Sequence, residues 1–147
     1  MRSARRRAAV LAAAGLCSLA ALGVLILAVD LARLCVLRSE IQVFADSAAR
    51  AAARELDGTA EGLARALAAV AVQSRHWKLG RSLLAGARAE FAASAAGPWE
   101  ARPGAPAGCQ FVRVRASGVA PLVLLPVVST ARSGAVDADA VAARPPR

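Results

Sequence analysis

The sequence predicts an α+β protein with a long N-terminal helix, a second helix and a small antiparallel β region. Three observations lead to this prediction. Residues 8–29 form an apolar run without a charged side chain. Residues 30–57 contain no glycine or proline and repeat apolar side chains at spacings of three and four, as amphipathic helices do. Residues 109–115 follow a Gly- and Pro-rich stretch and alternate between apolar and polar side chains, which is typical of a strand.

The apolar run at residues 8–29 is long enough to cross a bilayer, because about 20 apolar residues in a helix span the hydrocarbon core. The alternative is a cleaved secretory signal, since a basic segment at residues 1–7 precedes the run. Cleavage after Ala28 or after Ala32 would place Ile26 or Asp30 where a small residue is required. We therefore favour an uncleaved transmembrane helix.

Arginines flank both ends of this helix and predict its orientation. Four of them lie in the segment 1–7, whereas Arg33 and Arg38 follow the run and Asp30 partly offsets their charge. Positive residues beside a span stay in the cytoplasm. The expected topology is therefore a single pass with a cytoplasmic N-terminus and an extracytoplasmic C-terminal region.

Composition limits the functions that the chain can have. Its 147 residues allow one small domain beside the anchor. The net charge is +9, and Lys78 is the only lysine, so the positive charge comes almost entirely from arginine. These arginines are scattered, and aromatic residues make up only 3% of the chain, so they offer no platform for stacking bases. We expect membrane lipid, and no nucleic acid, as the partner of this charge.

The chain lacks the sequence patterns of catalytic and metal sites. His76 is the only histidine, and no two cysteines are spaced as a zinc-binding pair. The sequence also offers no nucleophile–histidine pair and no phosphate-binding glycine loop. We therefore expect no catalytic residues, no metal, no cofactor and no enzymatic activity.

The three cysteines are Cys17, Cys35 and Cys109. Cys17 lies within the apolar run and is expected to act as a small apolar residue. If the C-terminal region is exported, Cys35 and Cys109 both face an oxidising compartment, so a disulfide between them is a candidate. Pairing of Cys35 with another chain is the alternative.

The transmembrane helix is expected to continue through residues 30–57 and to reach about 50 residues, or roughly 75 Å. The apolar side chains of this continuation share an arc of about 120°. They are Leu34, Leu37, Ile41, Phe44, Ala45, Ala48, Ala52 and Leu56. Asp46 and Arg50 support the helix as an i, i+4 pair, and Gly58 suits its C-cap.

Residues 59–130 are expected to form the small α+β region. Thr59 is placed to cap a second helix, in which Glu61 and Arg65 form an i, i+4 pair. Its apolar face is expected to contain Leu63, Leu67 and Val70, and its end is expected between residues 75 and 80.

The pattern after this second helix is less regular. Residues 82–91 fit a strand or a helix, and the inward face of the next strand is expected to begin at Val112. Residues 119–128 suggest a covered strand or an edge segment, since they contain two prolines. Residues 131–147 are expected to form a C-terminal tail that includes a strand within residues 134–141.

Residues 30–58 also carry a recognisable series of motifs. Asp30 stands at the membrane exit, Gln42 precedes Ala45-Asp46, and an alanine-rich stretch ends in a Leu-Asp-Gly sequence. The alanines concerned include Ala48, Ala49 and Ala52. In these features the chain resembles the TadE/TadG-like proteins of the Flp (tight adherence, Tad) pilus-assembly family. It departs from their pattern at Val43-Phe44, where the group usually has Asn-Ala, and at Arg50 within the alanine run.

The resemblance implies a membrane-anchored, pilin-like structural or assembly component of a Flp/Tad-type pilus or a related secretion apparatus in the bacterial inner membrane. Its partners would be other subunits of that apparatus, bound through the N-terminal helix. Gly15, Ala20, Gly23 and the face from Ala45 to Ala53 would permit close helix packing. The alternative is an exported or tethered binding module formed by residues 59–147.

Overall fold

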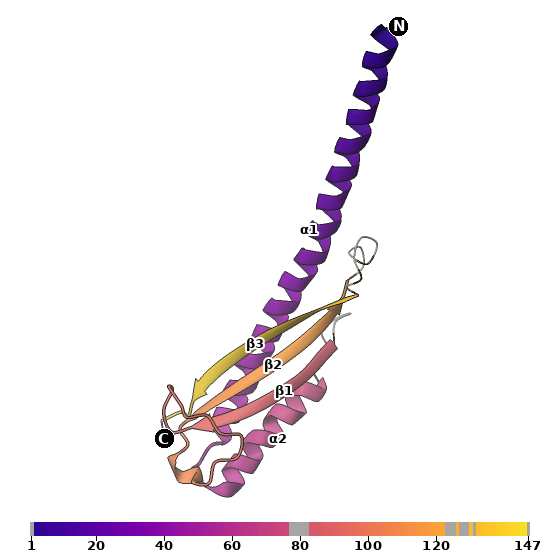
Figure 1. Ribbon diagram of the computed structural model, residues 1–147. Coiled ribbons are helices and arrows are strands. Elements are labelled where there is room, and N and C mark those ends of the chain that lie inside the picture. Colours follow the sequence, from indigo (N-terminus) through magenta and orange to yellow (C-terminus); the bar gives the residue numbers. More distant parts are fainter. Residues whose placement is uncertain (1, 77–82, 123–125, 127–129, 131, 147) are drawn as a thin grey trace.

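A computed structural model of the chain shows the predicted α+β architecture (Figure 1). It describes residues 2–76, 83–122, 126, 130 and 132–146. The elements are α1 (Arg2–Glu55), α2 (Ala60–His76), β1 (Leu83–Ala92), the 3-10 turn η1 (Pro106–Gly108), β2 (Phe111–Pro121) and β3 (Ser133–Ala143).

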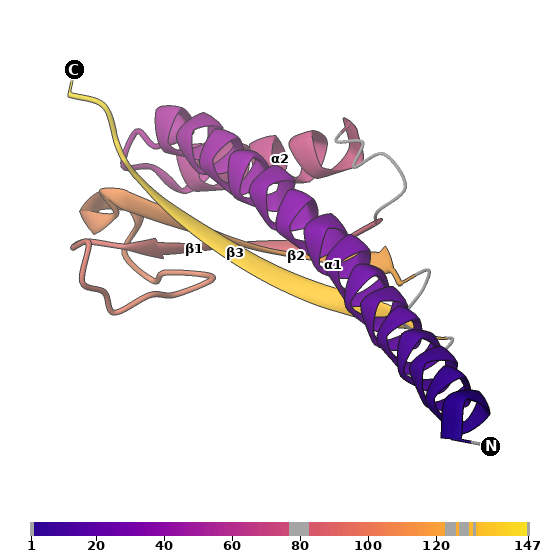
Figure 2. The same ribbon diagram turned by 90° about the horizontal axis from the view of Figure 1, so that it is seen from above.

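The helix α1 is a single uninterrupted element of 54 residues. Its first half stands clear of the rest of the molecule, and its second half crosses one face of the sheet (Figures 1 and 2). The predicted continuation of the membrane helix into the domain is therefore confirmed. Glu55 ends the helix two residues before the predicted end, and Gly58 follows with a φ of +89°, a conformation that glycine adopts without strain.

The three strands form an antiparallel sheet in the order β1-β2-β3. Residues 82–91, which fit a strand or a helix by pattern, thus fall largely in strand β1. Alternate residues of β2 are buried from Val112 onward, as predicted, because successive side chains of a strand point to opposite faces. The register pairs Val114 with Ala89 on β1 and with Ala140 on β3.

Both helices cover the same face of the sheet, and the core lies between these two layers (Figure 2). Alanines make up much of this core, so the layers approach closely. The largest fully buried apolar side chains come from α1, β1 and β2. They are Leu37, Ile41, Phe44, Phe91, Val112 and Val114.

Two glycines allow α1 to lie close to the strands. A Cβ atom on Gly134 of β3 would lie 2.5 Å from the Cδ2 atom of Leu34. The same atom on Gly118 of β2 would overlap the Cδ1 atom of Ile41. Since Ile41 is fully buried, it has little room to move aside. The contact between helix and sheet therefore depends on the missing side chains at these two positions.

A polar cluster joins the end of α1 to the start of α2. The Thr59 hydroxyl accepts the Gly62 N–H at 3.0 Å, as expected for the helix cap, and donates to the Asp57 carboxylate at 2.6 Å. Arg65 binds Asp57 at 2.5 Å and Glu55 at 3.2 Å. It thus pairs with the preceding turn and not with Glu61, because the turn brings two carboxylates within its reach.

Two further expectations for residues 59–147 require correction. On α2, Ala66 and Val70 are buried while Leu67 is exposed, so the apolar face is rotated away from Leu67. The strand expected within the tail is confirmed but extends over Ser133–Ala143, which makes most of the predicted tail part of the domain.

Parts of the prediction lie at or beyond the limits of the described residues. The second helix reaches His76, within its predicted end, and residues 77–82 lie outside the described part. Of the apolar residues 119–128, the first three belong to the end of β2, whereas 123–125 and 127–128 lie outside the described residues.

Candidate membrane anchor and packing faces of the long helix

The first half of α1 has the properties of a membrane span. The helix from Val10 to Glu55 contains an 18-residue window with a mean hydropathy of 2.5, and none of that window is buried within the molecule. Large apolar side chains such as Leu16 and Leu19 are therefore exposed on this half. Exposed leucines around a whole helix are costly in water and favourable in lipid. Among the described residues, one helix is thus long and apolar enough to cross a membrane, and it lies near the N-terminus.

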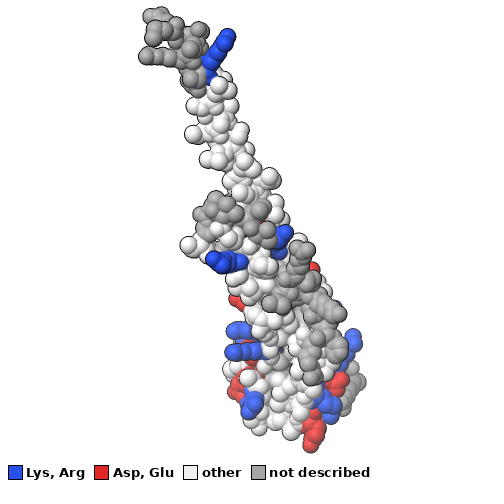
Figure 3. All heavy atoms as spheres, turned by 90° about the vertical axis from the view of Figure 1, so that its right-hand side faces the viewer, with Lys and Arg blue, Asp and Glu red and all other residues white. Residues whose placement is uncertain are grey.

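We call this first half of α1 the bare half, because no other described part of the molecule covers it. Charged groups lie at both of its ends. Arg6 and Arg7 are exposed near the N-terminus, and Arg33 and Arg38 are exposed beyond the apolar run. Figure 3 shows the uncharged stretch between two groups of basic side chains. Asp30, expected at the membrane exit, is only 2% exposed, so the domain covers α1 from this position.

Gln42 connects α1 to the last strand. Its amide donates to the Asp139 carbonyl oxygen of β3 at 3.1 Å and to the Asp46 carboxylate at 3.4 Å. Gln42 and Asp46 stand one helical turn apart, so one amide group reaches both the strand and its own helix. Gln42 therefore helps to hold α1 against β3, and Asp46 accepts a second hydrogen bond from its amide.

The alanine face of α1 lies inside the domain. Ala45, Ala48, Ala49 and Ala52 are at most 1% exposed and belong to the core beneath the sheet and α2. The expectation that this face packs against helices of other subunits is therefore wrong for the folded chain, because the chain's own strands and second helix occupy it. By contrast, Gly15, Ala20 and Gly23 are exposed on the bare half and have no neighbour that covers them.

The candidate disulfide between Cys35 and Cys109 is not formed. Both thiols are free, with Cys35 exposed on α1 and Cys109 buried in the core. The Cys109 sulfur lies 3.8 Å from the Ala105 carbonyl oxygen. Burial, followed by the nearby negative charge of Glu100, raises the pKa of the Cys109 thiol. This thiol is therefore a poor nucleophile as well as an inaccessible one. Cys17 is also free and is exposed on the bare half.

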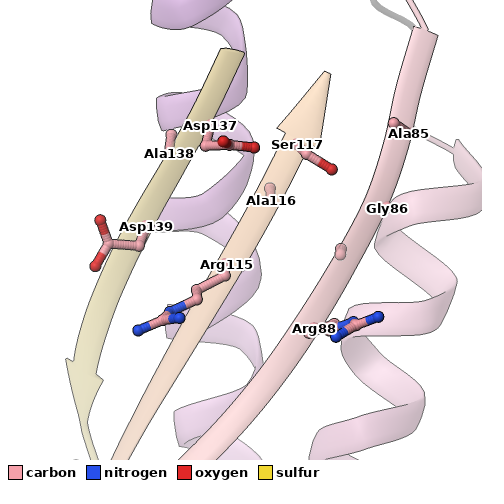
Figure 4. Close-up of a pocket in the computed structure, with 10 residues that line it drawn as sticks. Ala85, Gly86, Arg88, Arg115, Ala116, Ser117, Asp137, Ala138 and Asp139 are labelled. Atoms are coloured by element: carbon pink, nitrogen blue, oxygen red, sulfur yellow. The ribbon is translucent and has the colours of Figure 1, made fainter. Parts of the chain in front are cut away.

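The sheet face opposite the helices carries charged side chains around a shallow hollow of about 570 Å³. Its lining includes Arg88 of β1, Arg115 and Ser117 of β2, and Asp137 and Asp139 of β3. Figure 4 shows that Arg115 extends toward β3 and that Asp137 extends toward Ser117. Both signs of charge are thus presented on one open surface.

An ion cluster stands beside this hollow. Arg113 donates two hydrogen bonds to Glu90 across the β1–β2 pair, one of them at 2.8 Å, and its guanidinium lies 4.5 Å from the centre of the Trp99 ring. Arg115 approaches the same carboxylate at 3.8 Å. The strand alternation indicated that Arg113 points outward, but Glu90 and Trp99 could be assigned to it only once the strand register was known.

The described residues do not assemble a recognisable catalytic or metal centre. Within residues 2–76, 83–122 and 132–146, no group of three His, Cys, Asp or Glu side chains is placed to hold a metal ion. In comparisons with known proteins, no family model matches the chain, and no curated protein or solved structure matches it either. The class that the fold defines is therefore a small α+β domain on a single candidate membrane helix.

Proposed function

We propose that the chain is a membrane-anchored, pilin-like structural or assembly component of a Flp/Tad-type pilus or a related secretion apparatus. It resides in the bacterial inner membrane, with the N-terminus in the cytoplasm and the domain outside, and it carries no enzymatic activity. The observation that supports this most is the continuity of α1, whose bare first half passes without a break into a second half buried in the domain.

This continuity suits a structural subunit. A flexible linker would let a tethered domain move independently of its anchor, whereas α1 has no glycine or proline between Val24 and Glu55. A displacement of the anchor along the membrane normal is therefore transmitted directly to the domain. The Tad-like motifs support the same proposal, since Gln42 bonds the helix to β3, Asp46 accepts a second bond from the same amide, and Asp57 organises the turn that follows the helix.

Replacing residues 2–29 with a cleavable secretory signal tests this proposal. We expect a soluble extracytoplasmic domain and the loss of pilus assembly or secretion. A matched control replaces residues 8–29 with an unrelated apolar span of equal length, which restores anchoring alone. Unchanged assembly with the soluble form would contradict the proposal. A C-terminal reporter and determination of the mature N-terminus would establish the topology in the same strains.

A second candidate function rests on the open sheet face. A tethered binding module would use the hollow lined by Arg88, Arg115 and Asp137, where both charges are available to a polar partner. The fragment that tests it must begin near Asp30 and not at residue 59, because α1 supplies a large part of the core. We expect the double variant Arg88→Ala, Arg115→Ala to lose the partner if this function is correct. Retention of all partners by the folded variant would exclude this face.

A further inference from the structure

A line of exposed apolar side chains follows α1 on a side that the domain leaves uncovered. We define the outer stripe as Leu22, Val29, Val36 and Val43, which are spaced seven residues apart. Val36 and Val43 are 58% and 57% exposed, although their neighbours Leu37 and Phe44 are fully buried. The outer stripe and the core-facing stripe therefore occupy different sides of the same helix.

The spacing of the outer stripe is that of a two-helix seam. Apolar residues every seven positions, with a second set three positions later, form the contact between supercoiled helices. Leu25 and Ala32 supply the second set beside Leu22 and Val29, and the small Ser39 occupies the next position. Within residues 8–29 almost every position is apolar, so the repeat carries information mainly where it continues beyond that run, at Val36 and Val43.

The membrane does not account for the whole outer stripe. Val43 lies fourteen residues beyond Val29, which is about 21 Å along the helix. Along the helix axis it lies at the level of Gln42 and Asp139, where α1 already packs against the folded domain. Val36 and Val43 thus expose most of their apolar surface where the anchor has already ended. A partner that covers both the membrane half and this part of α1 must itself be long and parallel to it.

A second copy of the chain meets these requirements. All copies inserted in one membrane share one orientation, so two α1 helices lie parallel with equal positions side by side. Three of the four outer-stripe residues are valines, and β-branched residues at these positions, combined with leucine in the second set as at Leu25, favour two-stranded over larger bundles. Asp46 and Arg50 continue the seam beyond Val43. They carry opposite charges in successive layers, so each carboxylate lies near the guanidinium of the other copy.

We propose that the outer stripe is the seam of a parallel pair of α1 helices from two copies of this chain. The pair extends from the membrane past Val43 to Arg50 and leaves each domain facing outward. This inference rests on the proposed function only in that both require an uncleaved anchor. It also moves the contact between subunits from the buried alanine face to an exposed one.

Disulfide trapping of the full-length chain in lipid vesicles tests the pair. In a Cys17→Ala, Cys35→Ala background, Val36→Cys and Val43→Cys each place one thiol on the outer stripe. Mild oxidation with copper phenanthroline should give a disulfide-linked dimer with both variants. Leu31→Cys is the matched control, because Leu31 is equally exposed on α1 but points about 140° away from Val36 at 100° per residue. It should remain monomeric.

Equal trapping at Leu31→Cys, or none at both Val36→Cys and Val43→Cys, would overturn the pair. Adding Val29→Asp to the Val43→Cys variant should abolish the dimer. Persistence of the dimer would place the contact elsewhere. This experiment uses purified protein, so a negative trapping result does not contradict the proposed role in pilus assembly. Likewise, a negative result in the assembly experiment does not change the trapping result.

Discussion

The two halves of α1 are both rich in alanine and leucine, yet their surroundings are opposite. In the first half, leucines are exposed on every side, and a window of 18 residues has no buried surface. In the second half, apolar residues at spacings of three and four are buried against the sheet and α2. One helix therefore combines a candidate membrane span with a segment buried in the domain, and the pattern of its polar residues distinguishes the two parts.

Truncating one leucine in each half of α1 should give the largest difference between the two environments. Leu37→Ala removes a side chain that is 1% exposed, whereas Leu31→Ala removes one that is 56% exposed. Leu37→Ala should lower the free energy of unfolding by about 2–5 kcal/mol, because it leaves a cavity in the core. Leu31→Ala should change it by no more than about 0.5 kcal/mol. Urea unfolding of the detergent-solubilised chain measures both, and equal effects would show that α1 is not buried from Leu37 onward.

Adding a methyl group to a strand tests the packing of the buried half of α1 from the side of the sheet. Gly118→Ala places a Cβ against Ile41, and we expect a loss of about 1–3 kcal/mol in the free energy of unfolding from overpacking. Gly104→Ala is the control, because no atom lies within 4 Å of its Cβ position. If both variants unfold at the same urea concentration, the close approach of α1 to β2 is incorrect.

Removing the Gln42 amide tests the polar connection between the buried half and β3. Gln42→Ala should lower the free energy of unfolding by about 0.5–1.5 kcal/mol, the usual net contribution of one hydrogen bond. The bonded carbonyl belongs to the main chain, so Asp139→Ala should leave that bond intact. A larger loss in Asp139→Ala than in Gln42→Ala would assign the connection to the carboxylate instead.

The turn that ends the buried half should respond to acid. Hydrogen bonds from Thr59 and Arg65 hold the pKa of the Asp57 carboxyl well below its ordinary value of 3.8. A carboxyl with a lowered pKa in the folded state stabilises it above the unfolded pKa and loses this contribution as the pH falls. Acidification from pH 7 to pH 3 should therefore lower the urea midpoint more in the parent chain than in Asp57→Asn. An equal shift in both would remove Asp57 from the acid response.

The helical half of this fold could largely be predicted from the sequence. Local patterns carry that information: the apolar run, the three-and-four spacing up to Leu56, and the cap at Thr59 all appear within a few residues of one another. The inward face of β2 was readable from Val112 onward for the same reason.

The partners of these faces could not be predicted in the same way. A stripe of alanines shows that a face is covered, but Ala45 and Ala48 do not reveal whether their cover comes from the same chain or another. The Glu90–Arg113 pair depends on strand register across 23 residues, and the distance between Cys35 and Cys109 depends on the whole fold. The i, i+4 spacing of Glu61 and Arg65 predicts that they pair. The sequence does not show that the turn at Asp57 brings its carboxylate to Arg65.

The position of β3 at the end of the chain also has a consequence for biosynthesis. Gln42 and its acceptor on β3 are 97 residues apart, and Leu34 packs against Gly134 of the same strand. The helix is therefore made well before the strand that covers much of its apolar face. Contacts between such distant segments form slowly and only after the intervening chain has been synthesised. The apolar face of α1 must therefore be kept from aggregating during synthesis until β3 is available to cover it.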